Sequence, residues 1–124
     1  MATPRIADHL HDAVVEHFSF DADRGRLTIT LWEQPEALGN TGQPVRKQLV
    51  LSGIRNGAAV AAVQQLIEAE QRRLNRPELG YSVERFDFDP AQASRALELH
   101  LRLEIDQLPP LAVHCAKYTL QVVY

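Results

Sequence analysis

Histidine is the residue type in this chain best suited to chemistry, because imidazole binds metal ions and titrates near neutral pH. His9 and His11 are separated by one residue, which would place both on one edge of an extended segment, as paired zinc ligands require. A catalytic zinc site needs a third protein ligand, and His17, His100 or His114 could supply it. Nothing in the sequence fixes the spacing to that third ligand. We therefore expect surface or capping histidines, with no metal and no cofactor.

The single cysteine, Cys115, is a second candidate for chemistry, because a thiolate can act as a nucleophile. It alternates with Leu111 and Val113, so it is predicted to be a small core residue. The adjacent His114 points to the opposite face of the same strand, which is a poor arrangement for a catalytic pair. The sequence has no G-x-S-x-G motif, no P-loop and no Rossmann glycine motif. These features argue against an enzyme.

A short motif occurs twice and carries acidic residues with it. Val15–Asp21 reads V-E-x-F-x-F-D, and so does Val83–Asp89. The repeated glutamate and aspartate could bind a cation or act as acid and base. The simpler interpretation is that the aspartate opens a turn and the glutamate lies at a strand edge. After each copy come a polar turn, an alternating strand, a proline-containing loop and another apolar strand. The pattern predicts two copies of one three-stranded antiparallel meander, at about residues 13–54 and 81–124.

The elements that would position these residues follow from hydrophobic periodicity. Residues 13–20, 26–33, 45–52, 81–88, 96–105 and 111–123 are predicted strands, because apolar side chains alternate along most of them. The last of these changes the parity of its apolar face near Ala116-Lys117, which predicts a β-bulge there, with a sharp bend as the alternative. Apolar residues at helical spacing predict one helix at about 57–75, with Asn56 as its N-cap and Pro77 preventing its continuation.

These elements predict a single α+β domain, residues 1–124, with the order β-β-β-α-β-β-β. One helix of about 18 residues is too small to cover six strands. We expect one sheet curled around a central helix. Packing of the two units against each other, or coverage by a second chain, are the alternatives.

Composition limits the classes of partner. The formal charge of −3 and the pI near 5.9 argue against general nucleic-acid binding. Arg72, Arg73 and Arg76 cluster, but cations at the end of a helix are favoured by its dipole. No apolar run approaches the roughly 20 residues of a membrane span. A single cysteine is consistent with a reducing compartment, so we expect a cytoplasmic protein.

The remaining functional signal lies on predicted surfaces. Trp32 falls on the polar side of its strand, where it is either an interface anchor or covered by the loop 35–44. The polar side of the strand 96–105 is also open to a partner. The candidate partner-binding residues are Trp32, Glu33, Glu36, Glu98, His100, Arg102 and Glu104.

The chain resembles small bacterial α+β proteins that include immunity-protein families of polymorphic toxin systems. The resemblance is carried by His11-Asp12-Ala13, the strand Leu27–Leu31, the stretch Leu49-Val50-Leu51-Ser52-Gly53-Ile54 and the closing strand Leu111–Tyr124. Members of these families usually carry an aromatic residue where this chain has Leu51. The resemblance implies a non-enzymatic protein that binds and neutralises a cognate toxin through an acidic, toxin-specific surface.

Two other functions remain open at this point. The chain could be a small-ligand or metal-binding module that uses its histidines, or a self-associating subunit. A homodimer would have a mass twice 13.9 kDa.

Overall fold

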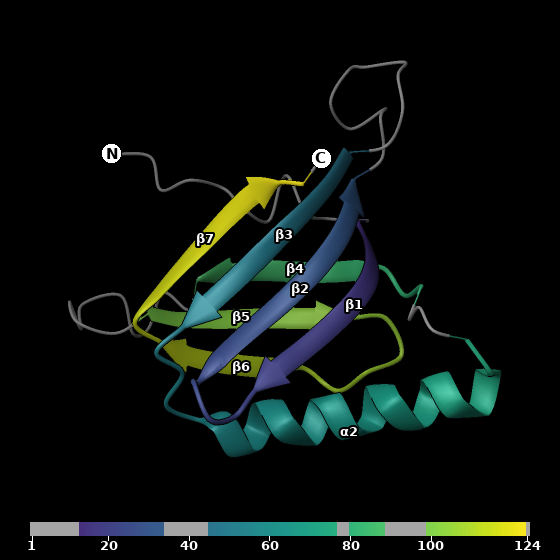
Figure 1. Ribbon diagram of the computed structural model, residues 1–124, viewed down its shortest axis with the longest axis horizontal. Helices are drawn as coiled ribbons and strands as arrows, with labels where there is room; N and C mark the ends of the chain where they lie inside the picture. The colour runs from purple at the N-terminus through teal and green to yellow at the C-terminus, as the bar shows by residue number, and fades with distance from the viewer. Residues whose placement is uncertain (1–12, 34–44, 77–79, 89–98, 124) are drawn as a thin grey trace.

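The computed structural model describes residues 13–33, 45–76, 80–88 and 99–123. They form an α+β domain with two antiparallel sheets, which Figure 1 shows one in front of the other with their strands running across each other. Sheet A has the order β1-β2-β3-β7, from strands Val14–Asp21, Arg26–Glu33, Val45–Ser52 and Lys117–Val122. Sheet B has the order β4-β5-β6, from strands Val83–Phe88, Leu99–Ile105 and Leu111–Cys115. The α+β class is confirmed, but the prediction of one curled sheet is wrong, because the strands divide between two sheets.

The core lies between the two sheets and follows from alternation along the strands. In β2, β3, β5 and β6 the aliphatic residues of one parity are buried, apart from Val45 and Leu99 at the first positions of β3 and β5, which are partly buried. Each buried side chain of this size stabilises the fold by about 1.5–3 kcal/mol. Among the most buried are Leu27, Ile29, Leu31, Leu49, Leu51, Leu101, Leu103, Val113 and Cys115. The prediction that Cys115 is a core residue is confirmed.

The change of parity near Ala116 has a different cause from the predicted bulge. Leu111–Cys115 pairs with β5 in sheet B, whereas Lys117–Val122 pairs with β3 in sheet A. Ala116 lies at a bend between them, and its amide donates to the Ser52 carbonyl at 2.9 Å. The chain therefore crosses from one sheet to the other at this residue, so the alternative of a sharp bend is correct.

A second junction joins the start of β1 to the start of β4. The Val15 amide donates to the Tyr81 carbonyl and the Val83 amide donates to the Ala13 carbonyl, both at 2.8 Å. Val14 and Ser82 form an isolated antiparallel bridge between these hydrogen bonds. The two sheets are thus tied together by backbone at this corner and by the bend at Ala116.

The helix α2, Gly57–Leu74, lies along the side where β1 and β6 end their sheets (Figure 1). Its Val60, Val63 and Ile67 are buried, as the helical spacing predicts. The helix is therefore packed against two sheet edges and does not lie at the centre of a curled sheet. No helix in the described residues is long and apolar enough to cross a membrane.

Asn56 is the N-cap residue, as predicted, but its side chain makes no capping hydrogen bond to the first turn, which corrects the predicted contact. Instead, its side-chain Nδ2 donates to the Ala112 carbonyl at 2.6 Å, and its Oδ1 accepts from the His114 backbone amide at 2.9 Å. On the other sheet, Gln64 Oε1 accepts from the Phe20 amide of β1. Polar side chains at the helix start and in its middle thus bond to backbone groups of both edge strands, which an unpaired edge would leave without partners.

Candidate functional site

A β-bulge in β1 brings a buried carboxylate to the outer face of sheet A. Val15 pairs with Leu31 and His17 pairs with Thr30, so Glu16 is an extra residue with no partner of its own on β2. A bulge bends the strand and redirects side chains on either side of it. Val15 and Phe18 are consequently both buried, although simple alternation predicts that they lie on opposite faces.

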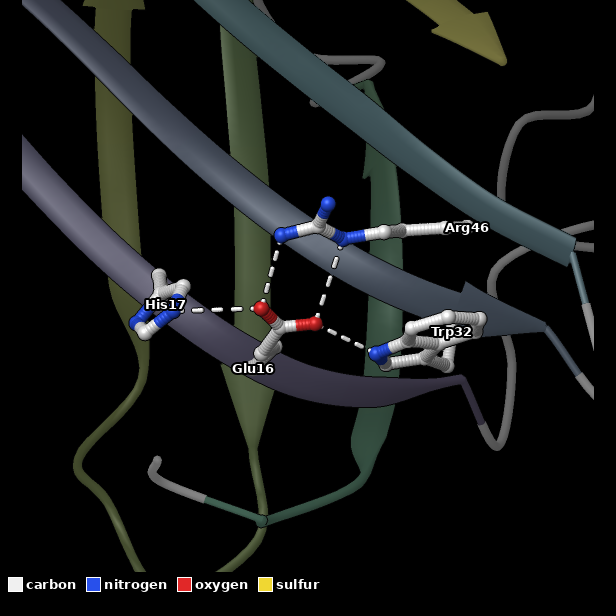
Figure 2. A network of polar contacts seen from close by, with 4 residues as sticks. All are labelled: Glu16, His17, Trp32 and Arg46. Carbon is white, nitrogen blue, oxygen red and sulfur yellow. Dashed lines mark hydrogen bonds and ion pairs between the residues drawn. The ribbon is translucent and has the colours of Figure 1, made fainter. Parts of the chain in front are cut away.

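Glu16 is the centre of a network that joins β1, β2 and β3 (Figure 2). The Trp32 indole Nε1 donates to Glu16 Oε1. The Arg46 guanidinium donates to both oxygens, from Nε to Oε1 at 3.2 Å and from Nη2 to Oε2 at 2.8 Å. His17 Nε2 lies 3.1 Å from Oε2. Two-point contact between arginine and a carboxylate fixes both the distance and the orientation of the pair.

Trp32 and Arg46 also contact each other directly. They are opposite one another in the β2–β3 ladder, and the guanidinium carbon lies 5.8 Å from the centre of the indole ring. This distance is in the range of a cation–π interaction. The tryptophan is therefore held both at its indole nitrogen and over its ring.

The electrostatics of the network favour the ionised carboxylate. Burial raises the pKa of Glu16, but the hydrogen bonds from Arg46 and Trp32 outweigh it, together with the charges of Arg46 and His17. The net effect holds the pKa of Glu16 below its ordinary value of 4.5. At neutral pH the network contains a glutamate–arginine ion pair whose glutamate side chain is only 10% exposed and whose arginine side chain is 36% exposed.

The predicted partner-binding residues do not form one surface. Trp32 lies on the outer face of sheet A, as predicted, and is half-buried. Arg102 and Glu104 lie on the outer face of sheet B with a contact of 3.4 Å, and His100 lies on the same face. The prediction that this side of the strand is polar and solvated is confirmed for these three residues. Glu36 and Glu98 lie outside the described residues.

Glu33 was expected beside Trp32 at the surface, but only 1% of it is exposed. It shares the parity of Leu31 and points into the space between the sheets, because successive residues of a strand face opposite sides. Lys47 Nζ lies 2.9 Å from its Oε1, yet neither oxygen accepts a hydrogen bond of good geometry from the described residues. Glu33 is therefore an interior charge paired with Lys47 and does not belong to an outer binding face.

Three members of the Glu16 network were not among the predicted site residues. The sequence marks Glu16 only as a repeated acid and His17 only as a possible third metal ligand. Arg46 is not among the predicted residues, although pairing the strands 26–33 and 45–52 through their alternation places it opposite Trp32. The bulge is also missing from the prediction, although both copies of the motif carry its signal: an apolar residue three positions before a buried phenylalanine breaks strict alternation.

The helix carries a second polar cluster at its C-terminal end. Glu70 accepts from Arg73 at 2.7 Å and from the Tyr81 hydroxyl at 2.8 Å. These hydrogen bonds lower the pKa of Glu70, and the bond to Glu70 raises the pKa of Tyr81. Beside it, an open hollow of about 500 Å³ is lined by Glu68, Gln71, Arg72, Asn75 and Arg76. Its mixed charges indicate a solvated helix end, in agreement with the prediction for these arginines.

Among the residues that the structure describes, no group of three or more His, Cys, Asp and Glu side chains is placed to hold a metal ion. Comparison of the chain with protein-family models, with curated proteins and with solved structures finds no match in any of the three.

Proposed function

We propose that this chain is a non-enzymatic binding protein, an immunity protein that neutralises a cognate bacterial toxin by covering it. The contact surface in this proposal is the outer face of sheet A around Trp32 and Arg46. The observation that carries it is the network of Figure 2, which fixes these two side chains in a half-exposed position before any partner arrives.

The residue types support a binding role. Tryptophan and arginine are the residues most enriched among those that dominate interface energies. Side chains that are already ordered lose less entropy on association, so pre-organised anchors bind more tightly. Neither sheet B nor α2 covers this face, because sheet B packs on the inner side and α2 lies along the β1 edge.

A comparison within the chain gives further support. β4 has the same bulge as β1, with Glu84 as the extra residue between Val83 and Arg85. The cross-strand partners in the two meanders also correspond. In the order first meander, then second, the matching sets of paired residues are Val15–Leu31 and Val83–Ile105, Phe18–Ile29–Leu49 and Phe86–Leu103–Leu111, and Phe20–Leu27–Leu51 and Phe88–Leu101–Val113. We therefore propose that the two meanders are copies of one duplicated unit.

The two copies differ at the bulge. Glu84 is exposed, and Asp106 and Leu108, which correspond to Trp32 and Arg46 by the same offsets, lie in the turn after β5. The bulge thus exists in β4 without a tryptophan–arginine pair beside it. We infer that Trp32 and Arg46 are not required to build the bulge, and that they serve the outer face of sheet A itself.

The proposal places the protein in the cytoplasm, bound to a toxin domain and not to nucleic acid or membrane. The test is co-expression with the toxin encoded beside this gene, followed by growth rescue and measurement of affinity. We expect Trp32→Ala to weaken binding by roughly 30-fold, which corresponds to an interface residue worth about 2 kcal/mol. Arg102→Ala, on the outer face of sheet B, is the matched control and should change affinity less than about threefold.

Two outcomes contradict the proposal. If no toxin is encoded beside the gene and no neighbouring gene product binds, the immunity function is wrong. If Arg102→Ala weakens toxin binding and Trp32→Ala does not, the function stands but the contact surface belongs to sheet B.

A further inference from the structure

A pair of histidines lies on the outer face of sheet B, away from the Glu16 network. His100 in β5 and His114 in β6 are direct partners in the ladder. The centres of their rings are 4.0 Å apart, and the ring planes are inclined by 31°. Both residues are partly exposed.

The hydrogen bonds of His114 show which kind of ladder pair this is. Its amide donates to Asn56 Oδ1 at 2.9 Å, and its carbonyl accepts from the Arg55 amide at 2.8 Å. Both backbone groups therefore point away from β5, so His100 and His114 form a non-hydrogen-bonded pair. In such pairs the Cα atoms are only about 4.5 Å apart and the side chains are closest.

The same hydrogen bonds hold the strand in place. Because Asn56 also donates to the Ala112 carbonyl at 2.6 Å, residues 112–114 are fixed to the start of α2. The backbone at His114 is thus held on one side of β6 by pairing with β5, and on the other side by hydrogen bonds to Arg55 and Asn56. A pre-positioned pair of ligands binds a metal more tightly than two independent side chains.

We propose that His100 and His114 together bind a divalent transition-metal ion of the kind that imidazole prefers, namely Zn²⁺, Ni²⁺ or Cu²⁺. One nitrogen from each ring coordinates the ion, and water completes the coordination. Cys115 is not a ligand, because it faces the core with 0% exposure. Of the nearby charges on this face, Arg102 is paired with Glu104, which offsets its repulsion of a cation. This inference does not depend on the proposed immunity function.

The test measures binding of Ni²⁺ and Zn²⁺ at pH 7.5 by titration calorimetry, on protein without a histidine tag. We expect one ion per chain at this pair, and at least a tenfold loss of affinity in both His100→Gln and His114→Gln. His17→Gln is the control for an exposed histidine on sheet A, and it should bind as the wild type does. The double variant His9→Gln/His11→Gln should also retain the ion. Mg²⁺, which prefers oxygen ligands, should give no binding.

The proposal is wrong if the wild type binds neither ion, if His100→Gln binds as tightly as the wild type, or if only the His9→Gln/His11→Gln variant loses binding. A second measurement applies should a glutamine variant fail to fold. Substoichiometric Cu²⁺ should broaden the ring-proton resonances of His100 and His114 in the wild type before those of His17. Broadening of other histidines first would equally overturn the assignment.

Discussion

Glu16 offers the sharpest test of the network on sheet A. Glu16→Gln keeps the shape of the side chain and removes its charge. The glutamine oxygen can still accept from Trp32 and from Arg46 Nε, whereas its amide group then faces Arg46 Nη2, which is also a donor. The variant therefore loses one arm of the two-point contact and gains a donor–donor clash.

The expected magnitude follows from the contacts. A hydrogen bond to a charged group contributes about 1.5–3 kcal/mol, and partial exposure of Arg46 reduces this value. We therefore expect Glu16→Gln to lower the free energy of unfolding by about 2 kcal/mol. For a domain of this size the melting temperature should fall by roughly 8 °C.

The matched control is Glu84→Gln, which makes the same chemical change at the same position of the second bulge. Glu84 is exposed, so its replacement should change stability by less than about 0.5 kcal/mol. The assay is urea unfolding followed by tryptophan fluorescence, with circular dichroism as a second probe.

The pH dependence provides an independent check. Because the pKa of Glu16 is lower in the folded state than its ordinary 4.5, the ionised carboxylate stabilises the fold. This contribution is fully present above the unfolded pKa and is lost as pH falls through the folded pKa. The difference between wild type and Glu16→Gln should thus be constant at neutral pH and shrink in acid. A difference that matches Glu84→Gln, or that does not shrink below pH 4.5, would refute the reasoning.

Three further predictions concern the supports of the fold. Asn56→Ala removes two hydrogen bonds to β6 and should destabilise the protein by about 1–2 kcal/mol in urea unfolding, and an unchanged midpoint would show that water replaces them without cost. Gly53→Ala adds a Cβ at 2.7 Å from the Cβ of Ala116 at a backbone φ of 69°, whereas Gly25→Ala meets its nearest atom at 3.4 Å with φ of 60°. The first should cost about 2–3 kcal/mol and the second about 1 kcal/mol, and equal losses would mean that only the backbone conformation matters. Cys115 should not react with a thiol reagent such as Ellman's until the protein unfolds, since it is fully buried, and fast labelling of the native protein would contradict this burial.

Much of the local structure could be predicted from the sequence, because it depends on residues close together in the chain. The strands Arg26–Glu33 and Val45–Ser52 have the predicted bounds, and the helix Gly57–Leu74 is one residue shorter than predicted. Asp21 opens its turn as expected, since its Oδ1 accepts from the Asp23 amide at 3.1 Å. Each of these features is set by period, turn chemistry or a breaker residue.

The errors arise where distant segments meet. Alternation shows that a strand has two faces, but it does not say which sheet the strand joins. The change of parity at Ala116 therefore predicts a bulge, where the structure has a crossing between sheets. Asn56 is the N-cap residue, but whether its side chain bonds to the first turn of the helix or to a strand edge depends on the position of β6. Of the Glu16 network, the sequence singles out only Trp32, because a tryptophan on a polar face is unusual. Arg46 follows from the register that alternation predicts for the strands 26–33 and 45–52, whereas the positions of Glu16 and His17 depend on the bulge.

The crossing at Ala116 also has a consequence for the order in which the protein can fold during synthesis. The fourth strand of sheet A, β7, emerges from the ribosome after the helix and all of sheet B. Until then β3 has one unpaired edge, so the nascent chain carries an open template for pairing with other chains. The edge of β3 should therefore be protected from pairing with other chains only when β7 docks beside it.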